Sequence, residues 1–153
     1  MDTGSLTPEY HLRPATPADA ARIRRIISLV HINPTALDWH RFILAVDQAG
    51  SVIGCGQVKP HTGGLQELAS LAVLPQWRGR GVARGIIEFL LRQHPGKLFL
   101  TCRASLEPLY LKFGFHTLEY EEMPVYYRRL SRLANVFNRL FRFSEPLLVM
   151  AKD

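Results

Sequence analysis

Cysteine is scarce in this chain of 153 residues, which holds only Cys55 and Cys102. Both lie in apolar stretches, and no group of Cys, His, Asp and Glu has the spacing of a metal site. We therefore expect no bound metal and two reduced, buried thiols. Reduced thiols favour a cytoplasmic protein.

Long apolar runs and an excess of acid are also missing. No run approaches the roughly 18 residues of a membrane-spanning helix, and residues 1–8 lack the basic and apolar regions of a secretory signal. Lysine and arginine number 19 against 13 acidic residues, which gives a net charge of +6. A basic chain suits an anionic ligand, a nucleic acid or an anionic membrane equally, so charge alone does not decide among these partners.

The size predicts one soluble domain over residues 1–153, with residues 1–9 flexible.

The most informative segment is the loop at 76–81, Gln-Trp-Arg-Gly-Arg-Gly. An apolar strand is predicted before it at 65–73, and an amphipathic helix after it at 82–94. Glycine lets the backbone approach a ligand, and the free N–H groups of a helix start favour an anion. The pattern therefore predicts a cradle for a pyrophosphate. The simpler alternative is a turn before an ordinary helix.

Two better-known phosphate motifs do not fit this loop. The dinucleotide fingerprint requires a third glycine or alanine where the chain has Arg84. The Walker A loop requires Gly-Lys-Ser/Thr, which is absent from this segment.

The remaining pattern predicts an α/β fold. Predicted strands and helices follow the order β-α-(α)-β-β-β-α-β-α-β, with Thr16 as the N-cap of the first helix and Pro17 at its first position. A hairpin joins strands 42–46 and 52–58, strand 97–102 follows the second long helix, and strand 146–150 ends the chain. This order predicts a mixed sheet with helices on both faces, not a doubly wound fold.

Two motifs in order resemble the GNAT superfamily of acyl-CoA-dependent N-acyltransferases. The loop fits the pattern Gln/Arg-x-x-Gly-x-Gly/Ala, and Leu109–Phe115 matches the Tyr-x-x-x-Gly-Phe end of a later helix. The resemblance extends over about residues 12–150. It implies a GNAT-like, mostly antiparallel sheet and an N-acetyltransferase that moves acetyl from acetyl-CoA to a primary amine directly, in a ternary complex.

The resemblance also implies the residues that contact the coenzyme. Backbone groups of Leu71, Ala72 and Val73 would pair with the pantetheine, and an N–H of this strand would face the thioester oxygen. The backbone N–H groups of the loop would hold the pyrophosphate, namely those of Arg78, Gly79, Arg80, Gly81, Val82 and Ala83.

Two side chains are the candidates for proton transfer. Tyr110 matches the family tyrosine that contacts the coenzyme and protonates the leaving thiolate; its alternative is a packing role. Glu67, predicted on the same strand face as Ala69, Leu71 and Val73, is the candidate base acting through water. The alternative for Glu67 is a strand-end carboxylate in solvent. Weaker candidates for the base are His61 and His116, and His40 could instead line the acceptor pocket.

One position departs from the family pattern. Many relatives have an asparagine seven residues before the tyrosine, in contact with the pantetheine, and this chain has Arg103 there. The departure leaves room for a second hypothesis, a non-catalytic acyl-CoA-binding or sensing domain. A third hypothesis is a basic membrane or nucleic-acid adaptor, although no nucleic-acid partner is expected.

A basic helix at 124–143 is predicted as an insertion before the last strand. Its apolar residues recur at helical spacing, namely Leu130, Leu133, Phe137, Leu140 and Phe141. It could lie on an anionic membrane, bind RNA or protein, or cover the acceptor site. A helix packed on the sheet with its arginines in water is the favoured interpretation. The acceptor amine, small molecule or protein, and the state of assembly, monomer or homodimer, stay open.

Overall fold

The computed structural model describes residues 9–141 and 145–153. The predicted flexibility of residues 1–8 and the end of the predicted basic helix at 142–143 therefore lie outside the described residues. The chain divides into two compact units. The first unit holds residues 1–59 and 68–93, and the second holds 60–67 and 94–153.

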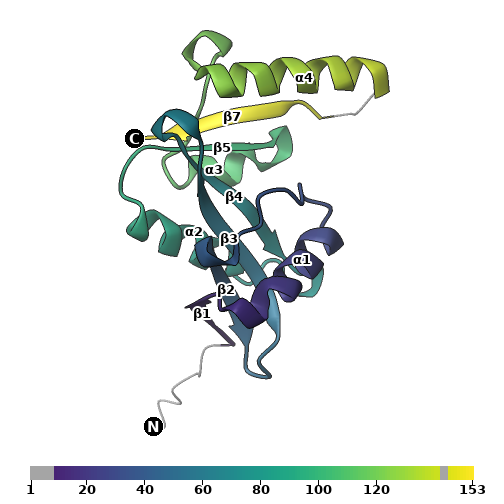
Figure 1. Cartoon of the computed structure of the whole chain (residues 1–153), viewed down its shortest axis with the longest axis vertical. Coiled ribbons are helices and arrows are strands. Elements are labelled where there is room, and N and C mark those ends of the chain that lie inside the picture. Colours follow the sequence, from purple (N-terminus) through teal and green to yellow (C-terminus); the bar gives the residue numbers. More distant parts are fainter. Residues whose placement is uncertain (1–8, 142–144) are drawn as a thin grey trace. The chain divides into compact units, whose positions relative to one another are not determined.

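Strands and two helices form the first unit (Figure 1). Its elements are β1 (Tyr10–Pro14), α1 (Ala20–Leu29), β2 (Phe42–Asp47), β3 (Val52–Pro60), β4 (Gln66–Val73) and α2 (Val82–Gln93). The strands follow the order β1-β2-β3-β4, and β1 and β3 both pair antiparallel with β2. The predicted hairpin at 42–58 is confirmed.

Alternation along β3 places different side chains on the two faces of this sheet. Cys55 belongs to an apolar cluster with Ile23 and Ile27 of α1, which covers one face. Gly56 points to the other face, where a Cβ would lie only 2.7 Å from Cγ2 of Ile86 on α2. Glycine at this position therefore lets α2 pack directly on the sheet. The predicted placement of helices on both faces is confirmed for this unit.

A buried carboxylate fixes the start of α1. Thr16 is the N-cap of a short 3-10 turn that leads into α1, with Pro17 at its first position, as predicted. Asp19 Oδ2 accepts hydrogen bonds from the Thr16 N–H at 2.8 Å and from Arg13 Nη1 at 2.7 Å. The Asp19 side chain is only 1% exposed, so these donors replace its water. The hydrogen bond from Arg13 is the main reason that the pKa of Asp19 lies far below its ordinary value.

Asp19→Ala is expected to lower the free energy of unfolding by about 2–3 kcal/mol, because Arg13 and Thr16 lose their shared acceptor. The folded pKa of Asp19 is depressed, so its contribution is present above the unfolded value of about 4 and is lost as pH falls further. Urea unfolding at pH 7 and pH 3 measures the difference, which should shrink at pH 3. Glu88→Ala, at an exposed carboxylate of α2, is the control. An equal loss from both variants would contradict the role of Asp19.

The second unit is a smaller sheet with two helices. Its elements are β5 (Leu98–Arg103), α3 (Glu107–Leu111), β6 (His116–Thr117), α4 (Val125–Phe141) and β7 (Leu147–Lys152). The order is β4-β5-β7-β6, with β4 parallel to β5 and both other pairs antiparallel. The predicted mixed, mostly antiparallel sheet is therefore confirmed.

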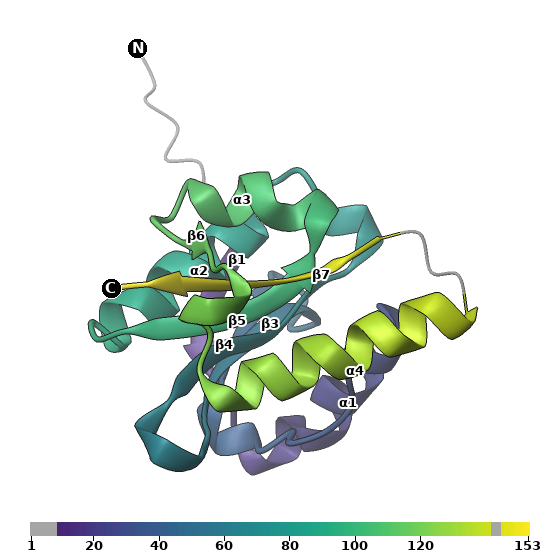
Figure 2. The ribbon, with the colours of Figure 1, turned by 90° about the horizontal axis from the view of Figure 1, so that it is seen from above.

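Helix α4 lies along β7 (Figures 1 and 2). Its fully buried Tyr127 belongs to an apolar cluster with Phe99 of β5 and Val149 of β7. The prediction of a helix packed on the sheet is thus correct for one face of α4. That α4 is an insertion relative to the family stays a prediction. Within the described residues, no helix is both long and apolar enough to cross a membrane.

Candidate functional site

The glycine loop joins β4 to α2 in the first unit. Gly79 and Gly81 have φ angles of +76° and +79°, in the left-handed region where glycine is favoured. A Cβ at either position would meet no protein atom within 4 Å. The backbone conformation thus requires glycine, and the space in front of each glycine is open to a ligand.

Helix α2 begins directly after these glycines. Its first turn closes with a 3.0 Å hydrogen bond from the Gly85 N–H to the Gly81 carbonyl, which also accepts from the Tyr10 hydroxyl at 3.1 Å. The amides of residues 82–84 precede the first helical hydrogen bond, so they have no partner inside the helix. Together with the positive end of the helix dipole, they form an anion site.

Two arginines add positive charge to this loop. Arg78 and Arg80 are both exposed. The Arg80 guanidinium lies over the ring of Trp77, 4.8 Å from its centroid, and 3.7 Å from a carboxylate oxygen of Glu9. The loop therefore combines backbone donors, a helix start and exposed cations, which is the chemistry that holds a diphosphate.

Strand β4 carries an irregularity just before Leu71, Ala72 and Val73. Ser70 has a φ of +56°, unusual for a non-glycine residue inside a strand. The buried Gln57 donates from Nε2 to Ser70 Oγ at 2.8 Å, and this bond holds the irregular position in place. Such breaks in a strand leave backbone groups outside the regular ladder and are common beside active sites. No feature of the sequence around Ser70 indicates this irregularity.

Glu67, at the start of β4, belongs to the second unit and is buried there at 6% exposure. Its Oε2 accepts a 2.8 Å hydrogen bond from the Tyr127 hydroxyl and lies 2.8 Å from His61 Nε2. Tyr126 covers His61, with ring centroids 4.5 Å apart. The alternative of a strand-end carboxylate in solvent is therefore wrong, because α4 and the turn at His61 enclose Glu67.

Burial differs along the strand face on which Glu67, Ala69, Leu71 and Val73 were predicted to lie together. Ala69, Leu71 and Val73 are half-buried, whereas Glu67 is buried by partners distant in sequence. The pKa of Tyr127 is raised, first by burial and then by the charge of Glu67. The Tyr127 phenol thus remains a hydrogen-bond donor to the carboxylate.

Tyr110 lies on α3 and is 7% exposed. Its ring meets Phe115 edge-on at 6.1 Å. Burial, with a smaller contribution from Cys102, raises the pKa of Tyr110 to about 12. The phenol is therefore protonated at neutral pH and available as a donor.

Cys102 and Cys55 are buried and free, as predicted.

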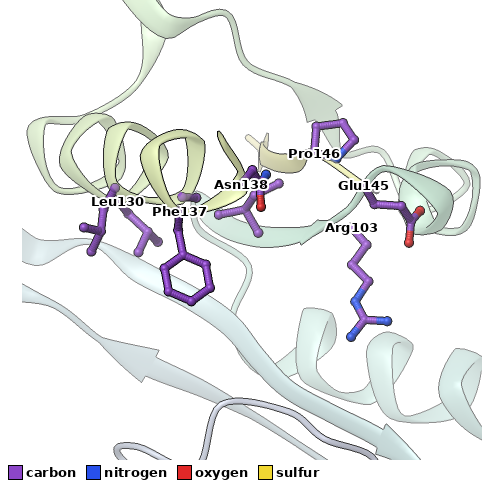
Figure 3. A pocket seen from close by; sticks show the side chains of 9 residues that line it. Arg103, Leu130, Phe137, Asn138, Glu145 and Pro146 are labelled. Carbon is purple, nitrogen blue, oxygen red and sulfur yellow. The ribbon is translucent and has the colours of Figure 1, made fainter. Parts of the chain in front are cut away.

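Arg103 ends β5 and lines a cavity of about 520 Å³ with apolar side chains of α4 (Figure 3). Leu130, Phe137 and Glu145 form part of its wall. The pKa of Glu145 is lowered chiefly by hydrogen bonding from Ser105, and the charge of Arg103 contributes less. A charged side chain thus borders this cavity where many relatives have an amide.

The remaining histidine candidates are exposed. His40 stacks on Trp39 and lies 2.6 Å from Asp38, and His116 is on the short strand β6. Within residues 9–141 and 145–153, no group of three or more His, Cys, Asp and Glu side chains could hold a metal.

The sequence was also compared with known proteins. Residues 38–117 match the family described as the acetyltransferase (GNAT) domain, which is more than half of the chain. The chain belongs to the GNAT acetyltransferase family. An N-acetyltransferase of Chlorobaculum tepidum, itself uncharacterised, is 29% identical over 125 residues, which cover 74% of this chain and 79% of that protein. The predicted GNAT membership and acyltransferase activity are confirmed.

Solved structures share the GNAT fold. Rv2747 of Mycobacterium tuberculosis, solved with CoA and NLQ, is 19% identical with a TM-score of 0.70, covering 93% of this chain and 98% of that one. N-acetylglutamate synthase of Neisseria gonorrhoeae, solved with coenzyme A and N-acetyl-glutamate, is 19% identical with a TM-score of 0.69 and 94% of this chain covered. This GNAT chain spans about a third (34%) of the length of that synthase.

Proposed function

We propose that this GNAT chain is an acetyl-CoA-dependent N-acetyltransferase that transfers the acetyl group directly to a primary amine in a ternary complex. The glycine loop is the observation that carries the proposal. Its glycines leave the space before α2 open, and its exposed arginines add positive charge to the loop. The coenzyme found in the gonococcal and mycobacterial structures supports a diphosphate-containing ligand for this fold.

In this proposal, the first unit binds the coenzyme. Backbone N–H groups of residues 78–83 hold the pyrophosphate, and backbone groups of residues 71–73 pair with the pantetheine. The irregular Ser70 supports the second role, because it releases neighbouring backbone groups from the strand ladder. A free N–H there can stabilise the negative charge that develops on the thioester oxygen.

Two side chains are proposed to transfer protons. The amine must lose a proton as its nitrogen bonds to the acetyl carbon, and the departing sulfur gains one as its bond to that carbon breaks. We assign the first transfer to Glu67, paired with His61, and the second to the Tyr110 phenol. The buried Glu67 contact at 2.8 Å supports this role for the pair, because it gives the proton an exit to a histidine.

The acceptor class is a primary amine of a small molecule or a protein. N-acetyl-glutamate is bound in the gonococcal synthase, and Arabidopsis thaliana NAA60 was solved with a bisubstrate analogue. Calorimetry with acetyl-CoA, followed by a thiol-release assay over amino acids, polyamines, aminoglycosides and peptides, tests the proposal. We expect both binding and release. Binding without release from any amine would instead identify an acyl-CoA sensor, and no binding would overturn the proposal.

Gly81→Ala is expected to raise the Kd for acetyl-CoA at least tenfold, because alanine disfavours a φ of +79° and its methyl group enters the open ligand space. Gly50→Ala is a matched control: Gly50 has a φ of +82°, and its Cβ would also meet nothing within 4 Å. Each variant should lose about 1 kcal/mol of stability. Calorimetry and thermal unfolding measure both effects. An unchanged Kd for Gly81→Ala would contradict the loop assignment.

A further inference from the structure

The cavity beside α4 is a space of ligand size within the second unit. Its volume of about 520 Å³ falls in the range of about 300–1,000 Å³ that is typical of small-molecule sites. Its lining comes from α4, the end of β5 and the segment that leads into β7 (Figure 3). Three segments distant in the sequence thus converge on one cavity.

Apolar side chains form most of the lining of this cavity. Leu130, Leu133 and Phe137 belong to α4, and Leu147 contributes from β7. Leu133 is 67% exposed, so a bound apolar group would cover surface that now faces water. This part of the cavity therefore favours the apolar portion of a ligand.

Arg103 brings a positive charge to the same cavity. It ends β5 and is exposed. Alternation along β5 places it on the same face as Phe99, which packs with Tyr127 of α4. Arg103 therefore lies on the side of β5 that α4 covers. Among the described residues of the lining, it is the only cation.

Glu145 also lines the cavity, but its carboxylate is held by another partner. Its Oε1 accepts a 3.0 Å hydrogen bond from the Ser105 N–H. Hydrogen bonding from Ser105 is the main cause of the lowered pKa of Glu145, and the charge of Arg103 contributes less. Arg103 therefore keeps donors for an anion, and a guanidinium binds a carboxylate through two parallel hydrogen bonds.

The cavity adjoins the cluster that holds the candidate base. Tyr127 donates a 2.8 Å hydrogen bond to Glu67 and belongs to the apolar cluster of the second unit. Leu130, three residues later on α4, packs against that cluster and also lines the cavity. A contiguous set of packed side chains in the second unit therefore leads from Glu67 to the cavity.

We propose that this cavity binds the acceptor and selects a primary amine that carries a carboxylate and an apolar side chain, as an apolar amino acid does. This inference rests on the acetyl transfer proposed above and names the class of its acceptor. Arg103 pairs with the carboxylate, and the apolar residues of α4 cover the side chain. The amine then lies at the end of the cavity nearest Glu67.

Charge favours this acceptor over a diamine, whose second ammonium group would pair with Glu145. The 17 residues of α4 include four arginines and no acidic residue, so the surroundings of the cavity are positive. A second ammonium group would also meet the guanidinium of Arg103. A carboxylate is attracted both by Arg103 and by these surroundings.

Paired acceptors test this inference by thiol release from acetyl-CoA. L-Leucine and L-leucinamide differ in the carboxylate, and L-leucine and glycine differ in the apolar side chain. In the wild type, kcat/KM should be about tenfold higher for L-leucine than for glycine. The ratio of kcat/KM for L-leucine to that for L-leucinamide should fall about tenfold in Arg103→Gln, because the carboxylate loses its charged partner. The two acceptors differ in their fraction of neutral amine, but this difference cancels when both proteins are measured with the same pair.

Matched variants locate the site. Arg139→Gln removes an exposed charge of α4 outside the cavity lining and should leave the ratio for L-leucine and L-leucinamide unchanged. Leu133→Asn should lower kcat/KM for L-leucine about fivefold and leave that for glycine within about twofold. Leu140→Asn, at a leucine that is 72% exposed and outside the lining, should change neither. Equal effects of Arg103→Gln and Arg139→Gln, or of the two leucine variants, would overturn the proposal.

Two further outcomes separate this inference from the proposed acetyl transfer. A kcat/KM for cadaverine that exceeds the value for L-leucine and falls in Glu145→Gln would overturn the acceptor class and leave acetyl transfer intact. If no amine releases thiol, the proposed transfer fails, and calorimetry of L-leucine with the chain saturated with coenzyme A tests the cavity directly. Binding that is weakened in Arg103→Gln and not in Arg139→Gln supports the cavity as a site for such amines. No binding overturns it.

Discussion

Glu67→Gln is expected to lower kcat for acetyl transfer about a hundredfold, in the range typical of a lost general base. The amide keeps the shape of the side chain but cannot take a proton from the amine. The deficit should shrink as pH rises towards the pKa of the amine acceptor, about 10, because the acceptor is then already neutral. Steady-state kinetics from pH 7 to pH 10 measure this convergence.

Tyr127→Phe is the matched control for Glu67→Gln. It removes the 2.8 Å hydrogen bond to Glu67 but keeps the carboxylate and the contact with His61. We expect a loss of less than about tenfold in kcat and about 1–3 kcal/mol in stability. A Glu67→Gln deficit that is the same at every pH would show that Glu67 has a structural role only.

Tyr110→Phe is expected to lower kcat about a hundredfold, because the departing thiolate loses its proton donor. Burial raises the pKa of Tyr110 to about 12. The phenol therefore stays protonated as pH rises, and the wild type should show no alkaline loss of kcat from this group below about pH 11. Single-turnover rates with saturating acetyl-CoA isolate the chemical step.

Tyr120→Phe is the control for Tyr110→Phe. Its hydroxyl is buried and has no hydrogen-bond partner among the described residues. Removing it should leave kcat unchanged and stabilise the fold by about 1 kcal/mol, since an unpaired buried hydroxyl is unfavourable. Turnover retained in Tyr110→Phe would remove Tyr110 as the acid and would leave it a packing residue against Phe115.

Local features of this fold were predictable because their physical causes are local. The glycine loop is recognisable in the sequence because glycines allow its positive φ angles. The start of α1 is recognisable because an N-cap residue is followed by proline. The hairpin between β2 and β3 follows from a turn that contains Gly50, with a φ of +82°. In each case, a few neighbouring residues determine the conformation.

Features that depend on distant partners were not predictable in the same way. Glu67 is buried by Tyr127, 60 residues later in the chain, and neither residue type indicates that contact. Ser70 adopts a positive φ through its surroundings, including the bond from Gln57, since serine itself does not favour that region.

The burial of individual residues on the basic helix α4 was also not predictable from the sequence. Helical spacing correctly predicted an amphipathic helix, but it did not show which of its apolar residues are buried. Leu130 packs against the core cluster of the second unit, whereas Leu133 and Leu140, grouped with it in the sequence, are 67% and 72% exposed. The side chain of Phe141 lies outside the described residues. Periodicity predicts the apolar side of a helix, but it does not predict how deeply each residue on that side is buried.

Gly56 has a consequence for the glycine loop, which it does not touch. The bare backbone at this position sets how deeply α2 settles onto β3, because any side chain there would collide with Ile86. The first turn of the same helix carries the proposed anion site, so the position of that site depends on how closely α2 packs at Gly56. We therefore expect a side chain at position 56 to weaken ligand binding by displacing α2, although position 56 does not touch the loop.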